Sequence, residues 1–248
     1  LIDWSDPRYR SVYPEGSDPK DHLQDVFATP AGGPEDPEKW QEFLEFNNNQ
    51  MRELMTNYGT VDLLWFDGDW ERSANQWKAK EFKAYLESLN PNVIVNSRLQ
   101  GYGDYETPEQ GIPLYGPKGV WEFCTTINDS WGYRPSDNHY KTSKQIIRMF
   151  CDCLTLGGKM LLDVGPKEDG TLDERQVKVL EDLGTFIHDN EEAIYETEKG
   201  LSYSQFLGGS TLSRDKKTRY LFVYDKPSEY LCVKGVKTPV KKVTVLHT

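Results

Sequence analysis

The sequence has few cysteines, no long apolar run and no block of basic residues. Its four cysteines form no Cys-x-x-Cys pair, which excludes a disulfide framework and a zinc site of the usual spacing. The apolar runs, such as residues 61–66 and 160–164, are too short for a bilayer-spanning helix of about 20 residues. The net charge of −11, with no Lys/Arg cluster, argues against nucleic acid as a partner. No membrane partner is expected either.

The composition is that of an ordered globular protein. Hydrophobic residues make up 37% of the chain and aromatic residues 12%, which excludes a disordered tail. A length of 248 residues allows one large core, or a domain of moderate size with a small second one. The sequence leaves the oligomeric state open.

Strand-like and helix-like segments alternate along most of the chain. Asp36 is a good N-cap ahead of a helix with apolar periodicity that continues to Tyr58. Residues 61–66 are nearly all apolar, which is typical of a parallel strand buried on both faces. Further helices are predicted over residues 75–89, 142–156 and 173–189, and further strands over residues 92–96, 120–123 and 160–164.

This order predicts an α/β fold, a (β/α)8-type barrel whose N-terminal strands are missing. Polar residues at the strand ends suit a barrel, whose chemistry lies where strands end and loops begin. Since about four barrel strands are evident and a barrel takes about 250 residues, we expect the first three or so strands upstream of Leu1. After Gly200, short alternating runs over residues 220–224, 230–233 and 243–246 predict a partial antiparallel β-sandwich. The predicted domains are residues 1–197 and residues 198–248.

The strongest candidate site is the segment WFDGDW, residues 65–70. An apolar strand brings Asp67 to its C-terminal end between aromatic residues, where Gly68 permits a tight turn. The alternative role for Asp67 is a cap of the following loop. Sugars stack their C–H faces on aromatic rings such as Trp65, and their hydroxyls need carboxylate, Arg and amide partners, so this mixture suits a glycoside pocket.

Two metal-based interpretations compete with this one. Asp67 and Asp69 are similar to the acidic pair that holds a metal-bound nucleotide sugar, which would make the protein a transferase, but no other residue supports it. Residues 163–174 resemble a calcium loop, yet Gly165 and Lys167 stand where oxygen ligands are required. We therefore expect no metal and no cofactor.

Five segments together resemble the retaining α-L-fucosidases, glycoside hydrolase family 29, in order and spacing. They are YGTVDLLWFDG (58–68), VNSR (95–98), WEFC (121–124), SWGY (130–133) and GGKMLLDVGP (157–166). The resemblance covers residues 1–197 and extends loosely into the β domain that follows the barrel in that family. It implies an exo-hydrolase that releases terminal α-L-fucose from glycoconjugates or oligosaccharides with retention, in a periplasmic, secreted or lysosomal setting.

The resemblance also implies roles for individual residues. Asp67 corresponds to the nucleophile, and Arg98 corresponds to a contact with the sugar hydroxyls. Trp131 corresponds to an aromatic wall against the methyl face of fucose, and Trp65 is a further candidate for contact with the sugar. Fucosylated oligosaccharides or glycoconjugates are the implied binding partners.

The acid/base residue is open between two glutamates. Glu109 is the best positional match, 109 − 67 = 42 residues after the nucleophile, on a polar, Gly-rich loop that could swing over a sugar. Glu122 is its rival and lies in a predicted strand, where a structural hydrogen bond is equally natural. The retaining mechanism needs the two carboxyl groups about 5 to 5.5 Å apart.

Two positions depart from the family pattern. Asp163 stands where the family commonly has Asn, and none of the four histidines matches the family histidines that hold the fucose hydroxyls. Those histidines are expected upstream of Leu1. A non-catalytic fucose-binding protein, or an inactive fragment of such an enzyme, therefore stays as the alternative.

Overall fold

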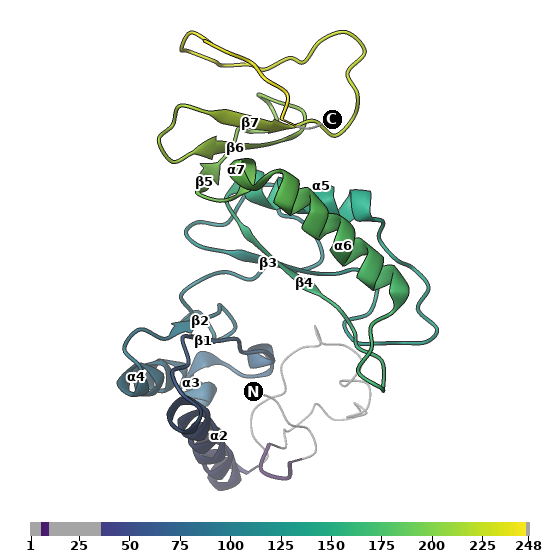
Figure 1. The fold of residues 1–248 in the computed structure, drawn as a ribbon. Helices are drawn as coiled ribbons and strands as arrows, with labels where there is room; N and C mark the ends of the chain where they lie inside the picture. Colours follow the sequence, from purple (N-terminus) through teal and green to yellow (C-terminus); the bar gives the residue numbers. More distant parts are fainter. Residues whose placement is uncertain (1–5, 10–35, 247–248) are drawn as a thin grey trace, which may run out of the picture. The chain divides into compact units, whose positions relative to one another are not determined.

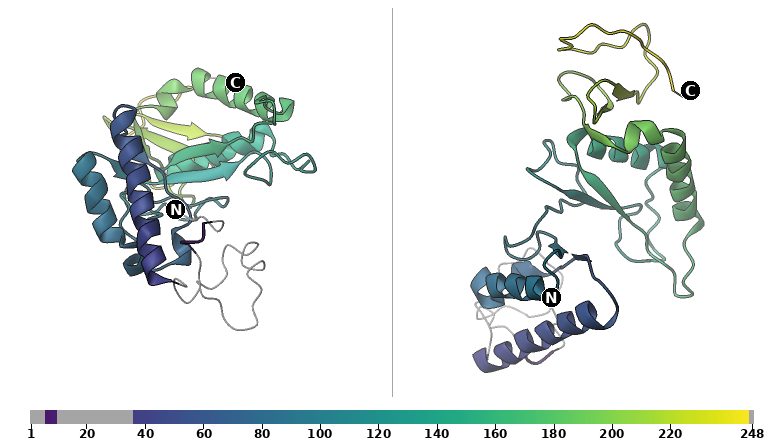
Figure 2. Two further views of the ribbon diagram at one scale, coloured as in Figure 1. Left: turned by 90° about the horizontal axis from the view of Figure 1, so that it is seen from below. Right: turned by 60° about the vertical axis from the view of Figure 1, so that its left-hand side comes forward.

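The computed structural model describes residues 6–9 and 36–246. The chain divides into two compact units, Leu1–Glu106 and Thr107–Thr248, and the elements of each are labelled in Figure 1 and seen from two further sides in Figure 2. A search of these described residues for a helix both long and apolar enough to span a bilayer finds none.

The first unit pairs two short parallel strands with helices. Its elements are, in chain order, α2 (Pro37–Asn57), β1 (Leu63–Leu64), the 3-10 helix η1 (Asp69–Glu71), α3 (Ala74–Trp77), α4 (Ala79–Leu89) and β2 (Ile94–Val95). Helix α2 begins as predicted, because the Asp36 carboxylate accepts hydrogen bonds from the backbone N–H groups of Glu38 at 3.0 Å and Lys39 at 3.2 Å. Strands β1 and β2 run parallel, which confirms the predicted parallel pairing.

Two predictions for this unit were wrong. The helix expected over residues 75–89 is two helices, since Lys78 has a left-handed backbone with φ of 50° and ends α3 before α4 starts. The strand expected over residues 61–66 is shorter and is not buried on both faces. Leu63 and Ile94 are each 45% exposed, because β1 and β2 pair only with each other among the described residues.

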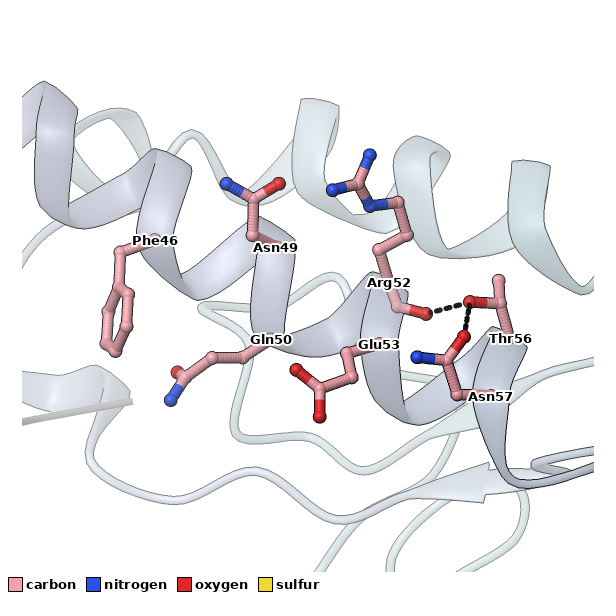
Figure 3. A pocket seen from close by; sticks show the side chains of 7 residues that line it. All are labelled: Phe46, Asn49, Gln50, Arg52, Glu53, Thr56 and Asn57. Carbon is pink, nitrogen blue, oxygen red and sulfur yellow. Dashed lines mark hydrogen bonds between the residues drawn. The ribbon is translucent and has the colours of Figure 1, made fainter.

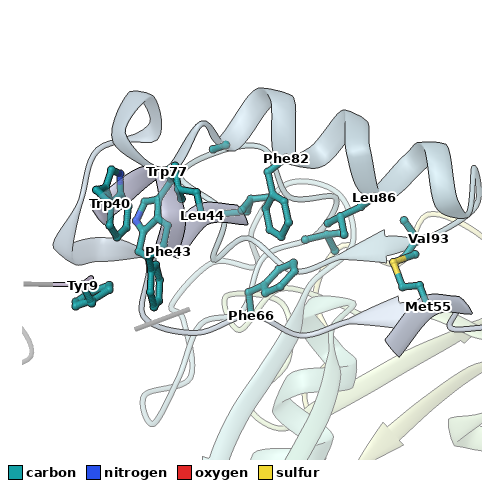
Figure 4. Close-up of a cluster of buried hydrophobic side chains, with 13 residues drawn as sticks. Tyr9, Trp40, Phe43, Leu44, Met55, Phe66, Trp77, Phe82, Leu86 and Val93 are labelled. Carbon is teal, nitrogen blue, oxygen red and sulfur yellow. The ribbon is translucent and has the colours of Figure 1, made fainter. Parts of the chain in front are cut away.

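An aromatic core holds the helices of the first unit together (Figure 4). Trp40 stacks on Phe43 with ring centroids 5.4 Å apart and meets Trp77 edge-on at 5.1 Å. The buried guanidinium of Arg72 lies 4.0 Å from the ring centroid of Trp40, and its Nη2 donates to the carbonyl of Tyr9 at 2.5 Å. These contacts fix the segment that follows β1 and η1 onto α2.

The second unit contains a β-α-β arrangement followed by an antiparallel sheet. Its elements are β3 (Glu122–Thr126), α5 (Ser143–Leu156), β4 (Lys159–Asp163), α6 (Glu174–Asp189), α7 (Glu191–Ile194), β5 (Thr197–Lys199), β6 (Gly209–Ser213) and β7 (Arg219–Phe222). Strands β3 and β4 pair in parallel through five residues each, and α5 and α6 lie on one side of them (Figures 1 and 2). Strand β3 begins and ends later than the predicted residues 120–123.

Helix α5 lies within one residue of its predicted span, residues 142–156. Thr142 and Gln145 form a reciprocal capping box at its start, and Gly157 closes its end with φ of 84°. The left-handed region is open to glycine at little cost. Helix α6 also lies within one residue of its predicted span.

The antiparallel character after residue 200 is confirmed, but the predicted strands are only partly correct. Strands β5, β6 and β7 pair in that order, and β7 corresponds to the predicted residues 220–224. Residues 230–233 and 243–246 are not strands. Strand β6 was not predicted, because its buried residues are small and polar. Its Ser210 N–H donates to Thr155 Oγ1 of α5 at 2.7 Å.

Candidate active site

Strand β1 is joined to the end of β2 through one buried side chain. The amide of Asn96, which directly follows β2, accepts from Phe66 N at 2.8 Å and donates to Phe66 O at 2.8 Å. Asn96 is fully buried. Gly103 passes so close that a Cβ there would collide with the carbonyl of Asn96. The backbone is therefore fixed on the residue immediately before Asp67.

Asp67 and Arg98 form an ion pair at these strand ends. Arg98 Nη1 donates to Asp67 Oδ1. The Asp67 side chain is 57% exposed and that of Arg98 only 15%, so the arginine is held in the protein and the carboxylate is open to a ligand. The Arg98 guanidinium lies 4.7 Å from the ring centroid of Trp65 and 5.9 Å from that of Trp70. The structure thus brings together the predicted residues Asp67, Arg98 and Trp65.

Asp69 has a different role from Asp67. Its buried carboxylate accepts from Gln100 N at 2.6 Å. Its carbonyl accepts from Gln100 Nε2 at 2.8 Å and from Trp77 Nε1 at 2.9 Å. Asp69 therefore braces the turn after the candidate nucleophile, which removes the support that the two aspartates gave to a transferase. Among the described residues, no three His, Cys, Asp or Glu side chains are placed to hold a metal.

The backbone of Glu109 is anchored to β3, which corrects the expectation of a swinging loop. Gln110 N donates to Cys124 O at 2.8 Å, and Cys124 N donates to Pro108 O at 2.9 Å. Glu109 forms a parallel bridge with Cys124, and its residue is exposed. An exposed carboxyl group on a fixed backbone is suited to meet a ligand in one orientation.

Glu122 is the first residue of β3 and stands opposite Lys159, the first residue of β4. It lies at the N-terminal end of the parallel pair, two positions before Cys124, whereas chemistry in parallel β/α folds lies at the C-terminal ends. The register therefore favours Glu109 over Glu122.

Trp131 follows β3 and its ring is on the surface. The residue is 43% exposed. A Cβ on Gly165, just after β4, would collide with the backbone of Gly132 and Tyr133. The chain next to Trp131 therefore lies directly on the end of β4, and only glycine at position 165 permits this contact.

Asp163 ends β4 opposite Thr126. Its Oδ2 is buried and has no hydrogen-bond partner among the described residues. Burial raises the pKa of Asp163 above its ordinary value of 3.8. Ionisation of this buried carboxyl group at neutral pH costs free energy. The Asn that the family commonly has at this position would carry no charge.

In the first unit, two hollows lie along α2 among the described residues. One hollow of about 440 Å³ follows a face of α2 (Figure 3), lined by Phe46, Asn49, Gln50, Arg52, Glu53, Thr56 and Asn57. Another, of about 150 Å³, lies between α2 and α4. Neither of these two hollows includes Asp67 or Arg98.

Asp67, Arg98 and Trp65 belong to the first unit, and Glu109, Glu122 and Trp131 belong to the second. Sequence reasoning missed Asn96 and Asp69 as the side chains that hold Asp67 in place. The signal that could have found Asn96 is its position, a polar residue directly where an apolar run ends.

Comparison with known proteins identifies the family. A family model described as alpha-L-fucosidase matches residues 1–192. The chain belongs to the alpha-L-fucosidase family. It is 29% identical over 195 residues to an alpha-L-fucosidase of Dictyostelium discoideum, covering 73% of this chain and 41% of that protein. It is 32% identical over 161 residues to a tissue alpha-L-fucosidase of Rattus norvegicus, covering 60% of this chain and 35% of that protein.

Solved fucosidase structures have the same fold over the matched region. An alpha-L-fucosidase from Vibrio sp. strain EJY3 matches with a TM-score of 0.76 and 29% identity, covering 84% of this chain and 38% of that chain. A trapped covalent intermediate of a Bacteroides thetaiotaomicron fucosidase, with 2-fluoro-fucosyl fluoride, matches with a TM-score of 0.76 and 28% identity. It covers 95% of this chain and 55% of that chain. The chain thus spans between about a third and about half of the length of these relatives.

Replacing Asn96 tests whether it holds the end of β1. Asn96→Ala leaves the N–H and C=O of Phe66 without their side-chain partner, so the free energy of unfolding is expected to fall by about 1 to 3 kcal/mol. Asn92→Ala removes an exposed amide ahead of β2. This control is expected to change the free energy of unfolding by less than about 0.5 kcal/mol. Urea denaturation of both variants measures the difference, and equal effects would contradict the assignment.

Replacing Asp163 tests the cost of its buried charge. Folding raises the pKa of Asp163. At a pH above this raised pKa the carboxyl group is ionised in the folded protein, and its buried charge lowers the free energy of unfolding. Asp163→Asn is therefore expected to raise Tm at pH 7, with a gain that disappears as the pH falls below 3.8. Asp62→Asn, at an exposed position before β1, is the control. Thermal unfolding across the pH range measures both, and a gain independent of pH would count against this account.

Proposed function

We propose that the protein is a retaining exo-α-L-fucosidase that releases terminal α-L-fucose from fucosylated oligosaccharides or glycoconjugates by double displacement. The observation that carries this proposal is the exposed carboxylate of Asp67, paired with Arg98 at the end of β1, in a chain of the alpha-L-fucosidase family. The covalent intermediate trapped in the Bacteroides thetaiotaomicron relative supports a two-step mechanism.

In the first step, Asp67 attacks the anomeric carbon of fucose. A bond forms between an Asp67 oxygen and that carbon while the bond to the aglycone oxygen breaks, and a protonated glutamic acid gives its proton to the departing oxygen. Arg98 orients the Asp67 carboxylate through their ion pair. Trp65 and Trp131 supply aromatic faces for the C–H and methyl groups of the sugar.

In the second step, the same glutamate, now ionised, takes a proton from water. The water oxygen attacks the anomeric carbon, and the bond to Asp67 breaks with its electron pair returning to the carboxylate. Two displacements at one carbon give net retention of configuration.

Glu109 is the proposed acid/base, with Glu122 as the alternative. Support comes from the anchored backbone of Glu109 beside Cys124 and from the position of Glu122 at the start of β3. The proposal requires the carboxyl groups of Asp67 and the acid/base to lie about 5 to 5.5 Å apart in the working enzyme.

The finer architecture is part of the same proposal. Residues 1–197 would contribute to a (β/α)8-type barrel and residues 198–248 to a β-sandwich domain. The parallel pairs β1–β2 and β3–β4 and the β-α-β arrangement around α5 support the first assignment, and the antiparallel sheet β5–β6–β7 supports the second.

A mechanism-based label tests Asp67. We expect 2-fluoro-fucosyl fluoride to form a stable ester on the peptide that contains Asp67, because the fluorine slows hydrolysis of the intermediate. Asp67→Asn should abolish labelling and turnover, while Asp62→Asn, the same change at the start of the same segment, should leave both intact. Peptide mass spectrometry locates the label. Fucose binding without any label would identify a non-catalytic fucose-binding protein instead.

Azide rescue separates the two glutamates. Glu109→Ala should lower turnover by about 10²- to 10⁴-fold, and azide should restore it, because azide attacks the fucosyl-enzyme without needing a general base. The product should be α-fucosyl azide, with retained configuration, which NMR identifies. Glu122→Ala serves as the matched variant and should show no rescue. Rescue of Glu122→Ala alone would reverse the assignment, and rescue of neither would reject both residues.

A further inference from the structure

The segment that carries Trp131 is a closed loop. We call residues 127–141, between β3 and α5, the aromatic loop. Lys141 N donates to Ile127 O at 2.7 Å, and Lys141 Nζ donates to Thr126 O at 2.7 Å. The two ends of the loop are thus joined at its base, as in compact Ω-type loops.

One carboxylate braces the inside of the aromatic loop. Asp137 Oδ2 accepts from Asn128 Nδ2 at 2.7 Å and from Ser130 N at 2.9 Å, and Oδ1 accepts from His139 N at 3.1 Å. The hydrogen bond from Asn128, together with those from Ser130 and His139, lowers the pKa of Asp137 to about 2. The carboxylate is therefore ionised at neutral pH and accepts from both arms of the loop.

The brace is tied to the body of the second unit. Asn128 is buried, and its Oδ1 accepts from the buried Gln176 Nε2 of α6 at 3.0 Å. A hydrogen bond between buried amides has few alternative partners, so it fixes the position of Asn128 and, through it, of Asp137.

Trp131 is held from both sides along the chain. The preceding residue, Ser130, is bound through its N–H to Asp137, and the following residues, Gly132 and Tyr133, lie on Gly165. Because the residue is 43% exposed, packing alone fixes its side chain less than that of a core residue, and the backbone on each side sets its direction. An aromatic side chain fixed before binding loses less conformational entropy when a ligand stacks on it.

We propose that Asp137 is a positioning residue that holds Trp131 in the orientation in which it receives the sugar, so that Asp137 sets substrate affinity without touching substrate. This inference rests on the proposed function, and it names the residue on which the aromatic wall depends. Only an ionised carboxylate offers an acceptor oxygen to each of the three donors that surround Asp137, because an amide replaces one oxygen with a donor.

The first measurement is the affinity of Asp137→Asn. In this variant an NH₂ group faces backbone or side-chain donors, so the aromatic loop loses a brace. KM for an aryl fucoside, and Kd for a fucose-configured iminocyclitol measured by calorimetry, should both rise about tenfold. The value of kcat should change by less than about twofold, because contacts shared by ground state and transition state affect KM.

Asp215→Asn is the matched control. Asp215 accepts from Ser213 Oγ at 2.7 Å and from Lys217 N at 3.1 Å in the turn between β6 and β7. It is thus another turn-bracing carboxylate of the second unit with the same charge change, and it should leave KM and Kd unchanged.

A double-mutant cycle shows whether Asp137 acts through Trp131. In a Trp131→Ala background, Asp137→Asn should have no further effect on Kd, because the ring that it positions is gone. Additive effects of the two substitutions would overturn the inference. If Asp137→Asn does not fold by circular dichroism, Gly165→Ala disturbs the other anchor of Trp131 and should show the same coupling in the same cycle.

Different results would contradict the positioning role of Asp137 and the proposed function. A wild-type protein that neither binds the iminocyclitol nor forms the 2-fluoro-fucosyl adduct would defeat the proposed function. A wild-type protein that does both, with an Asp137→Asn variant of unchanged Kd, would defeat the positioning role alone.

Discussion

A strand that ends at the protein surface must still satisfy the N–H and C=O of its last residue. In β1 and the residues after it, the Asn96 side chain makes both bonds to Phe66, so an amide from the neighbouring strand end replaces a continued ladder. The exposed Asp67 directly follows this point, and Arg98 of the neighbouring strand end meets it there. The hydrogen bonds to Phe66 therefore support the direction of Asp67 beyond what its ion pair supplies, because exposed ion pairs contribute little.

The two aspartates of the WFDGDW segment show how close neighbours divide their tasks. Gly68, with φ of 87°, reverses the chain between them, so that Asp67 stays on the surface while Asp69 turns into the protein. Asp69 then binds Gln100 N across the turn. Since a buried carboxylate is tolerated when its oxygens accept good hydrogen bonds, the second aspartate serves as a structural brace. The site has one exposed acid here because the other is used to hold the turn.

The parts of the fold that local signals encode could be predicted from the sequence. The caps at Asp36, Thr142 and Gly157 act on residues within four positions, so the ends of α2 and α5 followed from pattern alone. The break at Lys78 did not, because a lysine in a left-handed backbone carries no local sign. Strand β6 was missed for another reason: its burial comes from the contact of Ser210 with Thr155, 55 positions away in sequence.

In the candidate site too, residues with a local motif could be predicted, and residues defined by distant contacts could not. Asp67, Arg98 and Trp65 could be found because each stands next to an apolar strand with a recognisable motif. Asn96 was missed as a brace because its partner is 30 residues away. Asp137 was missed because a carboxylate in a polar loop has the sequence pattern of a solvated surface group. Its three hydrogen-bond donors are evident only in the structure. The candidate substrate contacts lie in recognisable motifs, whereas Asn96 and Asp137 are defined by three-dimensional contacts.

The exposed candidate side chains share one physical requirement, which also bears on the choice of the proposed acid/base. A side chain that must stay open to substrate gains little from packing, so its place is stabilised by hydrogen bonds to the backbone beside it. Asp67 has this support through Phe66, and Trp131 has it through Ser130. Glu109 has it too, since the backbone on both its sides bonds to Cys124. Glu122 is instead held within the ladder opposite Lys159, at the strand end where such a fold places stability rather than chemistry. Backbone support of this kind therefore distinguishes Glu109, the proposed acid/base, from Glu122.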